Sequence, residues 1–396
     1  MIDNKPRHII LYPEIEHPII NVKSRLKQQY LTLLEHFMYE LERDDEVTKV
    51  RFDVFKKFLL GSQPYVRQNF SESILEIFRM RYRYPRFYNY QNIFMFDCIY
   101  LLQIDDFESL NNIGLLAKNF IDTKHHGMID FITDKIVSSP KDLLGKNFIN
   151  RDMVDCLENI RAFRVLNEKT IVFTATMSAG KSTLINALIG NNLSFTKNAA
   201  CTSTILEFCS SPVYNSEYCT SIDDRKISWL DCKEVRKVTK DRKQHLIINS
   251  YFNSQLSSRK IRVIDTPGIN SAVHPTHKEI TLDRLRSCSA DDVIVYVISV
   301  DNYGAIGDGS HLQFIKNNVK FKKIIFVINM VDNCNPEDDS IREIIEDVRS
   351  YLVKIGYANP LVYPISAKAG LLFKKALINV ALTNNEEYEL ANYIKK

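Results

Sequence analysis

The sequence feature that most constrains the fold is the stretch Ala175–Thr183, which reads ATMSAGKST. It follows the apolar, β-branched run 170–174 and leads into the helical pattern of residues 184–189. A strand, a tight loop with Lys-Ser and a helix are the context of a phosphate-binding loop, because backbone N–H groups and the helix N-terminus attract an anion. We expect Lys181 to reach the β- and γ-phosphates of a nucleotide and the Ser182 hydroxyl to ligate Mg²⁺.

The composition is that of an ordinary soluble globular protein, with 396 residues, 45% hydrophobic and 25% charged. A formal net charge of +4 is too small to imply nucleic-acid binding by itself. The eight cysteines are scattered without a C-x-x-C pair, which favours free thiols in a reducing cytosol. The sequence shows no signal-peptide core and no apolar run long enough to span a bilayer. We therefore expect a cytoplasmic protein, with any membrane contact peripheral and at the inner face.

Hydrophobic periodicity divides the chain into regions with different expected secondary structure. Residues 1–167 show repeated three- and four-residue spacing, which predicts a helical region. Residues 168–381 alternate short β-branched runs with amphipathic helices, which predicts an α/β domain with a mostly parallel sheet. Residues 382–396 begin a further helix. The predicted strands are 170–175, 203–209, 260–265, 292–300, 323–329 and 361–366. Ligands of such sheets lie at the carboxyl ends of the strands.

The sequence Asp265-Thr-Pro-Gly268 follows the strand 260–265. In a γ-phosphate sensor, the Asp holds the Mg²⁺ shell through water, and the Gly N–H contacts the γ-phosphate and moves when it leaves. Pro and Gly also favour a simple turn, so these four residues alone do not decide. Because Asp265 begins the motif on a core strand 84 residues after Lys181 (265 − 181), we favour the sensor.

Two further strand ends carry groups suited to a guanine base. Asn329 and Asp332 form an N-x-x-D pattern after the strand 323–329. A carboxylate can accept hydrogen bonds from both N1–H and the N2 amine of guanine, which adenine cannot offer. The tripeptide Ser366–Lys368, with Ala367 at its centre, follows the last strand, where a backbone N–H can meet the guanine carbonyl. A strand followed by a turn remains the simpler alternative at Asn329.

A loop between the first two motifs offers a candidate switch threonine. Thr202 is our first choice for a hydroxyl that joins Mg²⁺ and a backbone that orients the attacking water, and Thr204 is its rival. A polar loop that leads into the next strand is the alternative for either residue.

With these motifs in order, residues 168–380 resemble the GTPase domain of the dynamin superfamily, in particular of bacterial dynamin-like proteins. The sequence S-A-G-K-S at Ser178–Ser182 matches their phosphate-binding loop. The stretches Asp265–Ala272, His277–Glu279 and Ile355–Pro360 strengthen the match, and a preceding helical segment fits the family. The resemblance implies a Ras-like P-loop fold, GTP hydrolysis stimulated by a GTPase-domain homodimer across the nucleotide face, and often membrane remodelling.

The resemblance also implies roles for single residues. Lys181 and Ser182 bind phosphate and Mg²⁺, and Ser178 matches the position that helps to hold a charge-compensating cation. Asp265 and Gly268 match the γ-phosphate switch, and Asp332 matches the residue that reads guanine. The implied nucleotide-binding set further includes Ala179, Gly180, Thr183, Asn329, Ser366, Ala367 and Lys368. The implied catalytic residues are Lys181, Ser178 and Thr202, and the metal ligands are Ser182, Thr202 and Asp265.

Three positions depart from the family pattern. Ala175 replaces the first loop glycine, which is compatible with a negative φ. Met177 stands where eukaryotic dynamins carry a catalytic Gln, and Met330 replaces the Lys of N-K-x-D, although its apolar stem can still pack on a base. These departures keep two alternatives open: a regulatory or scaffold protein that binds nucleotide with little turnover, and an ATP-hydrolysing P-loop protein.

Family members usually continue with a helical stalk and a membrane-binding tip, whereas 28 residues follow Lys368 here (396 − 368). The expectation is therefore a short or truncated form, or a helical partner protein that supplies the stalk.

Three other features favour simple structural roles. The Arg- and Tyr-rich stretch 79–90 and the basic helix 233–243 are typical of solvated helix faces rather than of nucleic-acid or membrane contacts. His125 and His126 lack partner ligands at metal-binding spacing.

Overall fold

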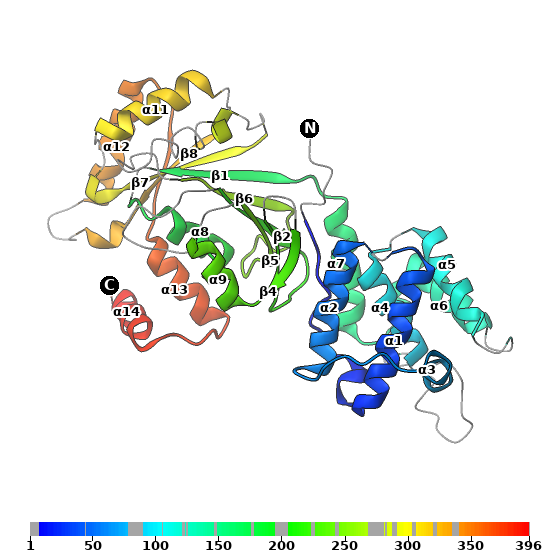
Figure 1. Cartoon of the computed structure of the whole chain (residues 1–396). Coiled ribbons are helices and arrows are strands. Elements are labelled where there is room, and N and C mark those ends of the chain that lie inside the picture. Colours follow the sequence, from blue (N-terminus) through cyan, green and yellow to red (C-terminus); the bar gives the residue numbers. More distant parts are fainter. Residues whose placement is uncertain are drawn as a thin grey trace.

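The chain folds into a group of helices followed by an α/β unit, shown as blue-to-cyan and green-to-red ribbons in Figure 1. We call residues 8–167 the helical part and residues 168–395 the α/β part. The computed structural model describes residues 8–43, 45–77, 90–104, 106–120, 123, 126–145, 149–175, 178–194, 205–222, 226–241, 245–267, 281, 283–286, 291–302, 306–319, 323–334 and 340–395.

The helical part consists of amphipathic helices around one apolar core. Their starts follow local capping chemistry: Asp45, Asp106 and Asn150 each accept hydrogen bonds from backbone N–H groups of the following first turn. The helices are α1 (Ser24–Glu40), α2 (Glu46–Leu60), α3 (Phe70–Ile77), α4 (Tyr90–Leu102), α5 (Phe107–Lys118), α6 (His126–Ser138) and α7 (Arg151–Arg164), with 3₁₀ turns at Pro18–Asn21 and Pro140–Leu143. Among the described residues, no helix combines the length and the apolar character needed to cross a bilayer.

A buried carboxylate ties three segments of the helical part together. Asp97 in α4 is fully buried and accepts hydrogen bonds from Tyr12 at 2.7 Å and Tyr30 at 2.5 Å. His17 Nε2 lies 3.0 Å from the same carboxylate. A buried carboxylate with several donors has its desolvation offset, so this cluster fixes the N-terminal segment against α1 and α4.

The α/β part is built on a nine-stranded sheet in the order β4-β3-β5-β2-β6-β1-β7-β8-β9. Most neighbouring pairs are parallel; the exceptions are β2 with β6, β3 with β4 and β3 with β5. The prediction of a mostly parallel α/β sheet is therefore confirmed. The strands are β1 (Lys169–Ala175), β2 (Leu206–Ser211), β3 (Tyr218–Ile222), β4 (Lys226–Leu230), β5 (Leu246–Tyr251), β6 (Ile261–Asp265), β7 (Val293–Ser299), β8 (Ile324–Asn329) and β9 (Leu361–Pro364).

Helices cover both faces of this sheet, and each face has its own apolar core. Figure 1 shows α8 (Lys181–Ile189), α9 (Cys232–Asp241) and α13 (Ala367–Leu377) below the sheet, and α11 (Ile306–Asn318) and α12 (Ile341–Ile355) above it. The last helix, α14 (Asn384–Lys395), lies beside α13. Because the central strands are buried on both sides, they are the continuous apolar runs typical of parallel sheets.

The helical part contacts the sheet at its β4 edge. Ile9, Val50, Val54 and other apolar side chains of the helical part pack against Cys219 and Ile227. Glu46 accepts a hydrogen bond from the backbone N–H of Ile227 at 2.9 Å. An edge strand presents unpaired backbone groups, so this docking covers the edge as well as burying apolar surface.

Candidate functional site

The predicted phosphate-binding loop has, at residues 178–180, a backbone suited to an anion. Ser178 and Gly180 have left-handed φ values of +63° and +77°, and Ala179 between them does not. An alternation of backbone handedness turns successive N–H groups toward one concave side, which is a known anion-binding arrangement. Gly180 is also the N-cap of α8, so the helix dipole adds to the attraction. Ala175 ends β1 fully buried and without a positive φ, so its methyl group is compatible with the strand.

Three side chains meet on a single carboxylate at the end of β6. Asp265 is fully buried and pairs with Lys181, the first residue of α8. Its Oδ2 accepts hydrogen bonds from Ser182 at 3.1 Å and from Ser194 at 3.0 Å. The parallel pairing of β1 and β6 places the loop after β1 next to this strand end. Two predicted motifs that are 84 residues apart (265 − 181) thus form one polar cluster.

Ser194 belongs to this cluster although the sequence pattern does not single it out. Asn186 in α8 holds its loop: the amide donates to the Ser194 carbonyl at 2.7 Å and accepts from the Ser194 N–H at 2.8 Å. Asn186 is itself buried. An Asn on the inner face of a short amphipathic helix is the one available signal, because a buried amide needs partners for its donors and its acceptor.

Asn329 connects the phosphate-binding loop to the Ser366–Lys368 tripeptide. Its Nδ2 donates to the carbonyl of Ala179 at 3.0 Å, and its Oδ1 accepts from the N–H of Ala367 at 3.0 Å. Only glycine fits beside it at position 180, because a Cβ there would lie 2.3 Å from Asn329 Nδ2. The side chain predicted for base recognition therefore braces the loop and the start of α13.

The remaining base-recognition candidates lie where β8 and β9 end side by side. Ser366 caps α13 by accepting from the N–H of Ala369. Met330 has a φ of +67° and lies against the phosphate-binding loop, 3.1 Å from a Cβ placed on Gly180. Asp332 accepts a hydrogen bond from Tyr393 at 2.8 Å, and Lys368 pairs with Glu389 at 2.6 Å. Both partners belong to α14 and were not foreseen from local sequence.

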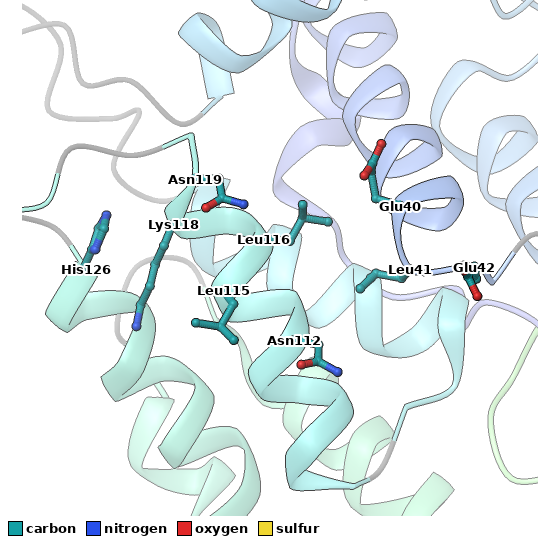
Figure 2. A pocket seen from close by; sticks show the side chains of 9 residues that line it. All are labelled: Glu40, Leu41, Glu42, Asn112, Leu115, Leu116, Lys118, Asn119 and His126. Carbon is teal, nitrogen blue, oxygen red and sulfur yellow. The ribbon is translucent and has the colours of Figure 1, made fainter.

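One hollow adjoins these groups, and another lies in the helical part. A cavity of about 370 Å³ adjoins the site between α8, α13 and α14 and is lined by Thr183, Asn186, Asn192, Ser194, Arg236, Lys368, Leu371, Leu372, Glu386 and Glu389. The second, in the helical part, is shown in Figure 2 and is lined by residues at and just after the end of α1, in α5 and at the start of α6, including Leu41, Leu116 and His126. None of the residues predicted for nucleotide binding lines the second hollow.

Several predicted residues lie outside the described part of the chain. These are Met177, Thr202, Thr204, Gly268 and His125, together with most of the stretch 79–90. Of the basic helix, Lys233, Arg236 and Lys237 are exposed on α9. Arg236 donates to the carbonyl of Asn192 at 3.0 Å.

The oxygen-rich cluster around Asp265 fits the chemistry of Mg²⁺. Hard cations prefer carboxylate and hydroxyl oxygens, and Mg²⁺ is usually held by one or two such groups together with phosphate and water. Asp265 at the end of β6 and Ser182 in the first turn of α8 supply these oxygens beside the predicted phosphate-binding loop. No group of three or more His, Cys, Asp or Glu side chains able to hold a metal occurs among the described residues. These residues therefore do not form a metal site built from protein ligands alone.

Sequence comparisons match part of the chain to a family model and to partial relatives. Residues 171–331 match the family model described as "Dynamin family". An uncharacterised protein of Caldicellulosiruptor sp. (strain Rt8B.4) is 29% identical over 57% of this chain and 56% of its own length. Dynamin-like protein A of Bacillus subtilis (strain 168) is 25% identical over 32% of this chain and 10% of its own length. The chain thus spans little more than half the length of the first relative and far less of the second.

Among solved structures, a bacterial dynamin pair described as oligomerised aligns with 86% of this chain and 60% of its own, at 16% identity and a TM-score of 0.41. Era of Aquifex aeolicus aligns with 54% of this chain and 56% of its own, at 18% identity and a TM-score of 0.32. The family match over residues 171–331 spans the strand–loop–helix, the Asp265 cluster and the end of β8, so this part of the chain is similar to the GTPase domain of the dynamin family.

Proposed function

We propose that this chain binds GTP with Mg²⁺ and hydrolyses it, and that association of two GTPase domains across the nucleotide face activates the reaction. The observation that carries the proposal is the convergence of Lys181, Ser182 and Ser194 on the buried Asp265, beside the concave backbone of residues 178–180.

The chain's own residues supply charge and position. Lys181 brings a cation to the place where the β- and γ-phosphates would lie, and it neutralises charge that develops on them. Asp265 is fully buried, so its carboxylate is held in one place by its hydrogen bonds rather than by water. The bound Mg²⁺ would supply further neutralisation of phosphate charge, with Ser182 and Asp265 as the groups that hold it. The Ser178 side chain is exposed to solvent, so a second cation or a partner subunit can reach it.

Base recognition is the second element of the proposal. Asn329 stabilises the wall between the phosphate-binding loop and α13, and Asp332 is the carboxylate that would accept N1–H and the N2 amine of guanine. The backbone of Ala367 and the side chain of Lys368 lie at the neighbouring strand end.

The test is GTP turnover measured as a function of protein concentration, with and without anionic liposomes. Dimer activation predicts a specific activity that rises with protein concentration, because the active species is second order in protein. A specific activity that stays constant over a hundredfold range of concentration contradicts dimer activation but leaves hydrolysis intact. Tight binding of radiolabelled GTP without phosphate release at high protein concentration contradicts hydrolysis itself and favours a nucleotide-binding regulatory or scaffold protein. A dependence on liposomes supports peripheral membrane contact.

Base selectivity is tested separately with Asp332→Asn. The amide can donate to the C2 carbonyl of xanthine, so we expect this variant to lose GTP and gain xanthosine triphosphate. Equal affinity of the wild-type chain for GTP and ATP contradicts the role given to Asp332.

A further inference from the structure

The last helix of the chain folds back onto the groups proposed to read the base. Tyr393 on α14 donates its hydroxyl to Oδ2 of Asp332 at 2.8 Å. One helical turn earlier, Glu389 accepts from Lys368 Nζ at 2.6 Å. Asp332 follows β8 and Lys368 follows β9, so a single helix holds one residue from each of the two strand ends between which the base would bind.

The chemistry of the Tyr393 contact resembles that of a guanine ring. Guanine offers Asp332 a planar aromatic ring with N–H donors at its edge, and both carboxylate oxygens are needed for the paired hydrogen bonds. Tyr393 also offers an aromatic ring with one donor at its edge. Partial burial and the hydrogen bond to Asp332 raise the pKa of Tyr393 to about 12, so the phenol keeps its proton and remains a donor at neutral pH.

The surface that α14 turns to the cavity is unfavourable for a nucleotide. Glu386 and Glu389 line the cavity of about 370 Å³ together with Thr183 of α8 and Lys368. Glu386 also pairs with Lys375 at 2.5 Å, so α14 engages two lysines of α13. Carboxylates that face the path of a polyphosphate repel it, and they occupy cations that would otherwise attract it.

We propose that α14 is a built-in competitor of the nucleotide: Tyr393 and Glu389 hold the base-recognition residues until guanine displaces the helix. The inference depends on the proposed function, since it requires that Asp332 reads guanine. It makes nucleotide binding and release of α14 two sides of one equilibrium. By linkage, docking of α14 lowers the affinity for nucleotide by the same factor by which bound nucleotide weakens the docking of α14.

The strength of this competition follows from exposure. The side chains of Lys368 and Glu389 are 54% and 24% exposed, so their ion pair contributes little. The hydrogen bond from Tyr393 to the carboxylate is the stronger contact, because one partner is charged. A helix that occupies the site most of the time weakens the apparent affinity in proportion to the fraction of open molecules. Removing the Tyr393 hydroxyl is therefore expected to tighten nucleotide binding about tenfold.

The experiment compares Tyr393→Phe with Tyr388→Phe in the full chain, using fluorescent N-methylanthraniloyl-GDP with Mg²⁺ as the probe. Tyr388 lies on the same helix and is 69% exposed, and Tyr and Phe have similar helix propensities, so it is a matched control. We expect a dissociation constant about tenfold lower for Tyr393→Phe, no change for Tyr388→Phe, and a smaller gain for Glu389→Gln. Hydrogen exchange of amides 384–395 is expected to become faster when the probe saturates the wild-type chain.

Opposite results overturn the inference. Unchanged or weaker binding by Tyr393→Phe means that the helix does not compete, or that it completes the site. Slower exchange of residues 384–395 with bound probe leads to the same conclusion. The Asp332→Asn variant distinguishes these outcomes from a failure of the proposed function. If that variant still changes its specificity from guanine to xanthine nucleotides, Asp332 reads the base and only the competition by α14 is contradicted. If no variant binds the probe and Asp332→Asn gains no xanthosine nucleotide, the proposed function and this inference fail together.

Discussion

A methyl group added at Gly180 tests whether the phosphate-binding loop and the end of β8 form one unit. Gly180 has a φ of +77°, and its Cβ would lie 2.3 Å from Nδ2 of Asn329. Gly180→Ala therefore combines a left-handed backbone, which costs about 1–2 kcal/mol for a residue other than glycine, with displacement of a buried amide. That displacement breaks the hydrogen bonds of Asn329 to Ala179 and Ala367 and costs a further ~1–3 kcal/mol. We expect a loss of about 2–5 kcal/mol from the free energy of unfolding of the α/β part.

Urea unfolding followed by tryptophan fluorescence measures this loss selectively, because Trp229 in β4 is the single tryptophan of the chain. Gly370→Ala is the matched control: Gly370 lies inside α13, has no positive φ, and nothing lies within 4 Å of an added Cβ. In a helix interior this change is expected to stabilise by about 0.5–1 kcal/mol. An unfolding midpoint of Gly180→Ala equal to that of the wild-type chain, with the control shifted as expected, would refute the close contact with Asn329.

Two further predictions concern buried carboxylates. Asp97→Leu leaves the hydroxyls of Tyr12 and Tyr30 without their acceptor, so we expect the free energy of unfolding of the helical part to fall by roughly 3 kcal/mol. Urea unfolding monitored by circular dichroism measures this loss. Burial by itself would raise the pKa of Glu207, but the hydrogen bond from His245 and nearby cations lower it from 4.5 to about 2. Because the folded pKa is the lower one, the stabilisation is present above pH 4.5 and is lost as the pH falls toward 2, which amounts to about 3 kcal/mol. Urea midpoints measured from pH 6 to pH 2 should therefore fall less steeply for Glu207→Gln than for the wild-type chain.

The strands that carry the site could be predicted because their own residues specify them. The runs that became β1, β6, β7 and β8 are apolar and β-branched, and a parallel sheet buries such runs on both faces. Their carboxyl ends share one edge, which brings Lys181 and Asp265 together without any further information. The predicted strand 361–366 ends instead at Pro364, because Ser366 leaves the sheet to cap α13.

The strands β3 and β4 could not be predicted in the same way. β3 and β4 are five residues long and mix polar with apolar side chains. Cys219 and Ile227 are buried there by side chains of the N-terminal segment and α2, more than 160 positions earlier in the chain. A pattern that depends on such distant contacts leaves no local period to detect.

Ser194 and Tyr393 escaped prediction for a related reason. Each is an ordinary polar residue in a segment without a motif. Each belongs to the site only because its hydroxyl donates a hydrogen bond to a carboxylate at the end of a distant strand. The motif residues Asp265 and Asp332 were predictable as carboxylates at strand ends, whereas the partners of those carboxylates depend on how Asn186 folds the loop and on the return of α14.

Strand β6 links the proposed phosphate site to the helical part over only a few residues. Asp265 ends the strand at the site, and Arg262, three residues earlier, lies 3.2 Å from Glu207 and 3.4 Å from Glu168. Oε2 of Glu168 also lies 2.9 Å from Nε2 of His8, and Nδ1 of His8 lies 3.0 Å from the carbonyl oxygen of Ser210 in β2. Arg262 is nearly fully buried, so removing either carboxylate would leave its buried charge with a single carboxylate partner. A rotation of the helical part against the sheet would have to break or carry the contacts of His8 with Glu168 and with the Ser210 carbonyl. The contacts at the start of β6 therefore add to the energetic cost of such a motion, together with the apolar packing of the helical part on the β4 edge.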